Sequence, residues 1–299
     1  MISTSGLSLD QAPPLRLPLG LFLTAPWLAM AAGMLVAVEA DTVLVSRWTP
    51  AALAATHLLA IGFLGQVMVG ALLQMLPVIA GAPVPLVRLT AVWTHLLLAL
   101  GSVLLAGGFM GAGPTVLAVG AAAAGLGFAG FLVAVALALG RAQGAPSTRV
   151  ALRLAALSLA LTVLLGLTLT SALLGWVSLP AFPEWVQAHL SFGLFGWVGL
   201  LIVGVAYQVV PLFHVTPAYP RWMTGALVPL LFSALTAAAL LNLTGAMRWA
   251  SWAYAAMALG FAGFAVTTVV LQVRRSRPRL DATLFHWWIA MAAVLAAVV

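Results

Sequence analysis

Two histidines, His57 and His189, have the type and position that could do chemistry in this chain. Each lies near the start of an apolar stretch long enough to cross a membrane, from Ala55 to Pro77 and from Ala188 to Pro211. A lone imidazole in lipid is costly unless it has a partner, so a histidine inside a membrane span indicates a functional site. Two of them at matching depth suggest a shared ligand.

Two neutral imidazoles that face each other suit the axial positions of a haem iron in a helix bundle. Each histidine is predicted to lie about 7 to 9 Å inside its span at 1.5 Å per residue, so both share one level. Glycines along the spans would let a flat macrocycle or a neighbouring helix approach closely. Two plainer interpretations stay open: the glycines are helix-packing surfaces, and each histidine hydrogen-bonds a carbonyl. The glycines are Gly62, Gly65, Gly70, Gly193, Gly196, Gly199 and Gly204.

The composition predicts an all-α polytopic transmembrane helix bundle. The 299 residues are 64% hydrophobic and 6% charged, with a mean hydropathy of +1.18, which is too apolar for a water-soluble core. The twelve basic residues are all arginine, and we interpret the net charge of +7 as loop charge rather than as a nucleic-acid surface. The absence of cysteine excludes disulfides, thiolate metal sites and covalently attached haem.

Nine helices are predicted from the roughly 20 apolar residues that a bilayer crossing requires. Ten of the twelve arginines then fall on the N-terminal side, and only Arg47 and Arg248 fall on the other. The positive-inside rule predicts a cytoplasmic N-terminus in a bacterial inner membrane. The predicted helices are 17–38, 51–79, 86–109, 114–139, 150–177, 185–213, 222–243, 249–273 and 282–299.

The chain repeats at a fixed offset, which carries Gly65 onto Gly199 and Gln74 onto Gln208. Each unit holds four helices, an even number, so the repeats are predicted to be parallel. The predicted domains are residues 1–145 and 146–279 as four-helix repeats, and 280–299 as one helix that starts a truncated third repeat.

The segment from Thr56-His57 through Gly70 to Pro83 resembles the second helix, and its following loop, of the haem-copper oxidase subunit I superfamily. That superfamily includes cytochrome oxidases and nitric oxide reductases, and this helix carries a histidine ligand of low-spin haem. The segment from Ala188-His189 to Pro211-Leu212-Phe213 resembles its tenth helix, which carries two haem-binding histidines. The second of these is Ser191 here. The resemblance implies haem b held by His57 and His189 as metal ligands.

The chain also departs from that family. The family's copper site needs an adjacent histidine pair, which is missing, so we expect no copper and no oxygen reduction. Electron transfer, or sensing of haem or nitric oxide, is the expected role, and whether the chain is an enzyme stays open. Haem propionates need charge-assisted partners, for which Arg47 and Arg248 are candidates, and Trp197 could line the pocket. Expected partners are membrane lipid, a redox partner or quinol, and a second copy of the chain.

Alternatives remain for the other polar residues. His95 is predicted to pack between helices, with a second haem or a proton path as the alternative. His214 is predicted to complement a helix C-terminal dipole as a cation, and His286 to contact headgroups. Gln74 and Gln208 could line the path of a small-molecule or metal transporter. A structural subunit without a cofactor is the third class.

Overall fold

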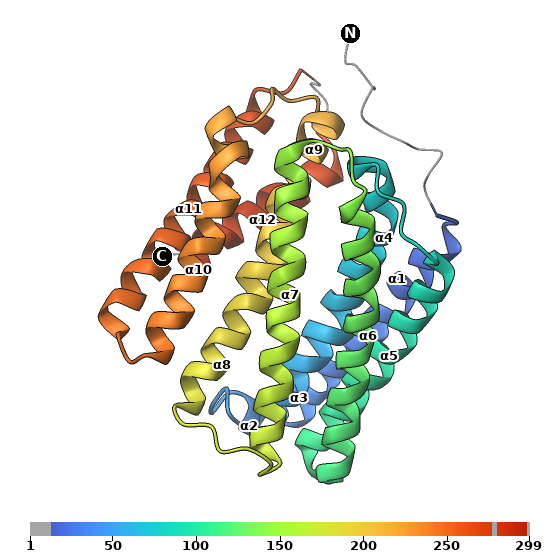
Figure 1. The fold of residues 1–299 in the computed structure, drawn as a ribbon, viewed down its shortest axis with the longest axis vertical. Coiled ribbons are helices and arrows are strands. Elements are labelled where there is room, and N and C mark those ends of the chain that lie inside the picture. Colours follow the sequence, from blue (N-terminus) through green and yellow to red (C-terminus); the bar gives the residue numbers. More distant parts are fainter. Residues whose placement is uncertain (1–12, 277–279, 298–299) are drawn as a thin grey trace. The chain divides into compact units, whose positions relative to one another are not determined.

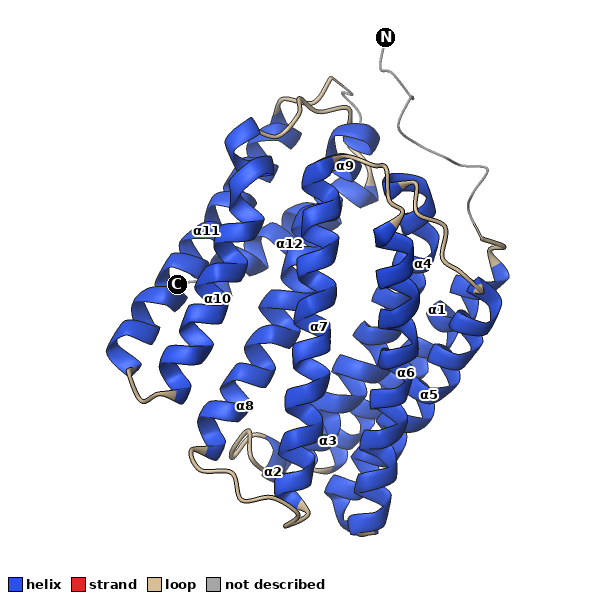
Figure 2. Ribbon diagram, in the orientation of Figure 1, coloured by secondary structure: helices blue, strands red, loops and turns tan. Residues whose placement is uncertain are grey.

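The computed structural model describes residues 13–276 and 280–297, and every regular element in these ranges is a helix (Figure 2). Eight of these helices are long and apolar enough to cross a membrane, and a shorter apolar helix follows them. A helix pairs every backbone N–H and C=O within its own segment, as hydrocarbon surroundings require. The predicted all-α, multi-pass transmembrane bundle is therefore confirmed.

The predicted helix ends agree with the structure to within four residues, apart from the predicted end at Val299, which lies outside the described residues. The short helix α2 and the π-helical segments η2 to η5 are not predicted by the sequence. In chain order (Figure 1) the elements are α1 Arg16–Val38, α2 Ala40–Val43, α3 Pro50–His57, η2 Leu58–Gly65, α4 Gln66–Ala80, α5 Val87–Gly107, η3 Gly108–Ala112, α6 Pro114–Gly140, α7 Pro146–Leu173, α8 Phe182–Ser191, η4 Phe192–Gly199, α9 Leu200–His214, η5 Met223–Leu227, α10 Val228–Leu243, α11 Met247–Val273 and α12 Ala282–Ala297.

The chain divides into two compact units. The first contains Met1–Gly144 and Val163–Phe182, and the second contains Ala145–Thr162 and Pro183–Val299. The boundary at Gly144 lies next to the predicted boundary at 145. Helix α7 contributes to both units, its first part to the second unit and its last part to the first. The assignment of the units as parallel repeats stays a prediction.

The helix bounds nevertheless recur with the predicted spacing. The offset that carries Gly65 onto Gly199 also carries η2 (58–65) onto η4 (192–199) and α4 (66–80) onto α9 (200–214). An offset shorter by a single position carries α6 (114–140) onto α11 (247–273). Both α4 and α9 are followed by a residue with positive φ, Gly81 at 56° and Val215 at 52°. The helix bounds thus recur at these offsets, and the division into parallel four-helix repeats stays a prediction.

One close helix contact also recurs inside each unit. A Cβ added at Gly65 would lie 3.3 Å from the ring of Phe128, and one added at Gly199 would lie 2.7 Å from the ring of Phe261. Phe128 and Phe261 occupy the same position in α6 and in α11 when the two helices are aligned from their first residues. Lipid tails are as apolar as the side chains, so such van der Waals contacts, rather than a hydrophobic effect, hold membrane helices together.

We expect Gly101→Ala to weaken the contact between α5 and α6. The new Cβ would lie 2.6 Å from the backbone nitrogen of Ala124, so the two helices must move apart, at a cost of about 1 to 3 kcal/mol. The matched control is Gly33→Ala in α1, where no atom lies within 4 Å and the higher helix propensity of alanine adds up to about 1 kcal/mol. SDS-induced unfolding measures both. Equal stability of the two variants would contradict the packing described.

Candidate functional site

His57 is the last residue of α3 and directly precedes η2. Its Nδ1 lies 2.8 Å from the carbonyl oxygen of Leu53, and its ring centroid lies 5.0 Å from that of Phe109. A carbonyl only accepts, so Nδ1–H is the donor and Nε2 carries the lone pair of the neutral ring. The side chain is half-buried within the first unit.

His189 lies in α8, three residues before η4. Its Nδ1–H donates to the carbonyl oxygen of Thr162 on α7 at 2.9 Å, so Nε2 again carries the lone pair. Metal-binding imidazoles usually have this arrangement, in which a hydrogen bond from the other ring nitrogen fixes the tautomer and the ring. His57 and His189 belong to different units, and each geometry is that of its own unit.

The π-helical segments η2 and η4 follow the two histidines at equivalent places. Such segments occur frequently at functional sites, because they shift the hydrogen-bond ladder locally. The glycines Gly62 and Gly65 of η2 recur as Gly196 and Gly199 of η4.

Neighbouring helices pack closely against the glycines of these segments. A Cβ at Gly62 would lie 3.0 Å from Leu28, and one at Gly196 would lie 2.5 Å from Ser158. Of the two roles that the sequence left open for these glycines, the structure supports helix packing rather than a macrocycle cradle. The donor chemistry of the two imidazoles thus fits haem ligation, whereas these glycine faces do not hold the ring.

The other predicted cofactor residues lie as follows. Arg47 is exposed before α3, with its guanidinium carbon 4.8 Å from the ring centroid of Trp48, a cation–π contact. Arg248 is exposed in the first turn of α11, in the second unit. Trp197 is buried in η4, about 12 Å along the span from His189 at 1.5 Å per residue. Among the described residues, no group of three or more His, Cys, Asp or Glu could hold a metal ion.

His95 joins two helices of the first unit. Its Nε2 lies 2.8 Å from the hydroxyl oxygen of Thr24, which itself donates to the carbonyl of Gly20 at 3.1 Å. The hydroxyl proton is therefore committed, so Nε2–H of His95 is the donor. This contact between α5 and α1 supports the helix-packing interpretation.

The prediction for His214 as a cation at a helix end is wrong. The side chain is 4% exposed, and its Nδ1 accepts a hydrogen bond from the amide of Gln272 at 3.0 Å. The physical reason is that α11 covers the end of α9, which removes the solvent that a charged imidazole needs. His286 is exposed on α12, with Nδ1 2.6 Å from the carbonyl oxygen of Ala282.

Tyr207 and Tyr219 form a pair in the second unit, which the sequence did not predict. Tyr207 donates to the carbonyl of Met223 at 2.9 Å, and the two phenol rings are 5.3 Å apart. Tyr219 donates to Thr268 at 2.9 Å, because the Thr268 hydroxyl already donates to the carbonyl of Phe264. Burial raises the pKa of Tyr219 to about 12, so its phenol stays protonated at neutral pH.

Three glutamines of the membrane spans differ in their hydrogen bonds. Gln208 donates to the hydroxyl of Thr148 at 2.9 Å, a contact between α9 and α7. Gln66 is completely buried, and neither its amide nitrogen nor its oxygen has a hydrogen-bond partner among the described residues. The oxygen of Gln74 is also buried without such a partner. The residue equivalent to Gln66 in the second unit is Leu200.

Comparisons of the chain with family models, with curated proteins and with solved structures find no match. The resemblance to haem-copper oxidase subunit I therefore rests on the segments around His57 and His189 alone.

We expect Gln66→Leu to stabilise the protein. Leucine removes a buried amide that lacks partners, and such an amide costs about 1 to 3 kcal/mol. The control Gln208→Leu removes a hydrogen bond and should lower stability by about 0.5 to 1.5 kcal/mol. Both are measured by SDS-induced unfolding. A loss of stability in Gln66→Leu would show that the amide has a partner in the folded protein.

Proposed function

We propose that this multi-pass membrane protein binds a b-type haem through Nε2 of His57 and Nε2 of His189. The proposal rests on the hydrogen bonds that the two imidazole rings have in common. Each donates Nδ1–H to a backbone carbonyl, at 2.8 and 2.9 Å, which is the usual arrangement of imidazoles that bind a metal through Nε2.

The two backbone hydrogen bonds give each imidazole a fixed role. They hold the rings in the neutral tautomer, and they raise the basicity of Nε2, which would strengthen its bond to a metal. A haem held by these two residues would supply one-electron chemistry. Because both ligand nitrogens would come from the protein, electron transfer, or sensing of haem or nitric oxide, is favoured over oxygen reduction.

The distribution of the arginines indicates how the protein is oriented in the membrane. We place the protein in a bacterial inner membrane with a cytoplasmic N-terminus, because ten of its twelve arginines then lie inside. Arg277 and Arg279, which contribute to that count, lie outside the described residues. In this orientation both histidines lie near the outer face, with Arg47 and Arg248 as candidate partners of the haem propionates. A redox protein or quinol is the proposed partner there, and a homo-oligomer is compatible with this assignment.

The haem proposal predicts a specific loss of spectrum. The purified protein, expressed with sufficient haem, should show a low-spin b-type absorption spectrum, and His57→Ala or His189→Ala should remove it. The control His95→Ala, which breaks only a contact between helices, should keep nearly full haem content. Absorption spectra and the pyridine haemochrome assay measure this.

Two results would overturn the assignment. One is a wild-type protein without haem absorption, which would favour a transporter or a structural subunit. The other is normal haem content in the His57→Ala, His189→Ala double variant. Circular dichroism of each variant separates loss of haem from loss of fold.

The orientation is tested separately. A reporter fused after Arg141 or after Arg275 should be cytoplasmic, and one fused after Arg47 should be periplasmic, because basic loops are retained inside. Alkaline phosphatase, active outside, and a fluorescent protein, active inside, give opposite readouts. The reverse pattern would place the histidines near the inner face.

A further inference from the structure

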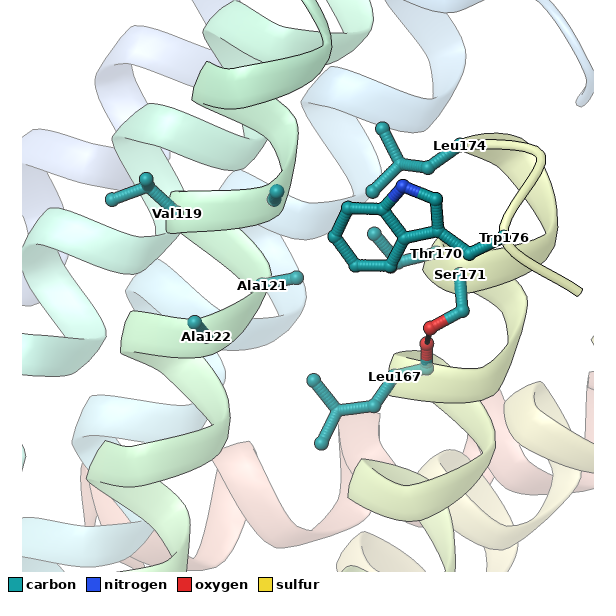
Figure 3. A pocket seen from close by; sticks show the side chains of 9 residues that line it. Val119, Ala121, Ala122, Leu167, Thr170, Ser171, Leu174 and Trp176 are labelled. Atoms are coloured by element: carbon teal, nitrogen blue, oxygen red, sulfur yellow. Dashed lines mark hydrogen bonds between the residues drawn. The ribbon is translucent and has the colours of Figure 1, made fainter.

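The first unit contains a pocket of about 330 Å³ between α6 and the last part of α7. Figure 3 shows Ala121 and Ala122 on one wall, Leu167 and Leu174 on the other, and the indole of Trp176 reaching across from beyond the end of α7. The helical part of the α7 wall, from Leu167 to the end of α7 at Leu173, extends over about 9 Å at 1.5 Å per residue. We call this feature the α6–α7 groove.

The lining of the α6–α7 groove is almost entirely apolar. Its two hydroxyls, Thr170 and Ser171, donate to the carbonyls of Gly166 and Leu167, both at 2.9 Å. None of its nine lining residues is charged. A water needs two to four polar partners and fills about 30 Å³, so water does not suit a groove of this size and apolar character.

One wall of the α6–α7 groove differs in sequence from the equivalent helix of the second unit. When α6 and α11 are aligned from their first residues, Ala121 corresponds to Tyr254, whose hydroxyl reaches Asn242 at 3.3 Å. A large side chain therefore stands in the second unit where the first has a methyl group.

We propose that the α6–α7 groove binds one acyl chain of a phospholipid from the leaflet at its open end. Helices α6 and α7 both have membrane length and composition, so the surrounding solvent is hydrocarbon. The groove starts at the helix ends, where Trp176 is 68% exposed in the position of an interfacial tryptophan, and continues inward, as an acyl chain does. The occupant packs against alanine, leucine and indole, and its headgroup lies beside Trp176. This proposal is independent of haem binding.

The experiment uses the full chain in bilayer nanodiscs that contain a phosphatidylcholine with a photoreactive diazirine in one acyl chain. After irradiation, mass spectrometry maps the lipid adducts on the peptides. We expect adducts to concentrate on residues 118–122 and 167–176, above the level of other exposed helix surfaces. Even labelling of all exposed helices would overturn the proposal.

Substitutions make the test specific. Ala122 is exposed on the groove wall, so Ala122→Trp should fill the groove and reduce its labelling to the level of other exposed surfaces. Ala118→Phe, one turn away, should have the same effect if Ala122→Trp fails to fold. The matched control Ala136→Trp, also exposed on α6, should leave the labelling unchanged.

Two further results would count against an acyl chain. Unchanged groove labelling in Ala122→Trp and Ala118→Phe would show that the adducts form elsewhere on these helices. Displacement of the label by a short-chain ubiquinone analogue, but not by excess unlabelled phospholipid, would assign the groove to a quinone.

Discussion

Within hydrocarbon, every backbone N–H and C=O has to be paired inside the protein, and the structure follows from this constraint. This constraint accounts for the long helices of the described chain and for the π-helical form of their irregular segments. Where the α-helical ladder shifts, in η2 and η4, the chain changes to π-helix and keeps its backbone bonds internal instead of opening a loop. Helices formed in this way can join only through close packing and a few side-chain contacts, as Gly65 and Gly199 illustrate.

The same constraint governs the polar side chains. Thr24 and Thr268 each donate their proton to the carbonyl one turn earlier, which leaves the oxygen able to accept. That oxygen then receives His95 in the first unit and Tyr219 in the second. A hydroxyl that its own helix has satisfied thus becomes the acceptor that joins two helices. The amide of Gln66 is an exception, because neither its nitrogen nor its oxygen has a hydrogen-bond partner among the described residues.

The sequence predicts the helices well because a membrane span is defined by length and hydrophobicity, which are local properties. It does not predict the π-helical segments, because a one-residue shift of the hydrogen-bond ladder leaves composition unchanged. It also misses the surroundings of His214. The partner, Gln272, is 58 residues away, and only the packing of α11 against the end of α9 brings the two together. The candidate ligands His57 and His189 could be named from the sequence, but their tautomers required the positions of Leu53 and Thr162.

His57 and His189 do not occupy equivalent positions relative to the π-helical segments that follow them. His57 directly precedes η2, and Ser191 directly precedes η4, so the position equivalent to His57 is Ser191 and His189 lies two residues earlier. Two residues correspond to a rotation of about 200° and a rise of about 3 Å along an α-helix. This difference explains why His57 bonds a carbonyl of its own helix, whereas His189 bonds one on α7. The two imidazoles are therefore held differently, although η2 and η4 correspond in their bounds. One ring is fixed by its own helix, and the other is fixed by a neighbouring helix of its own unit.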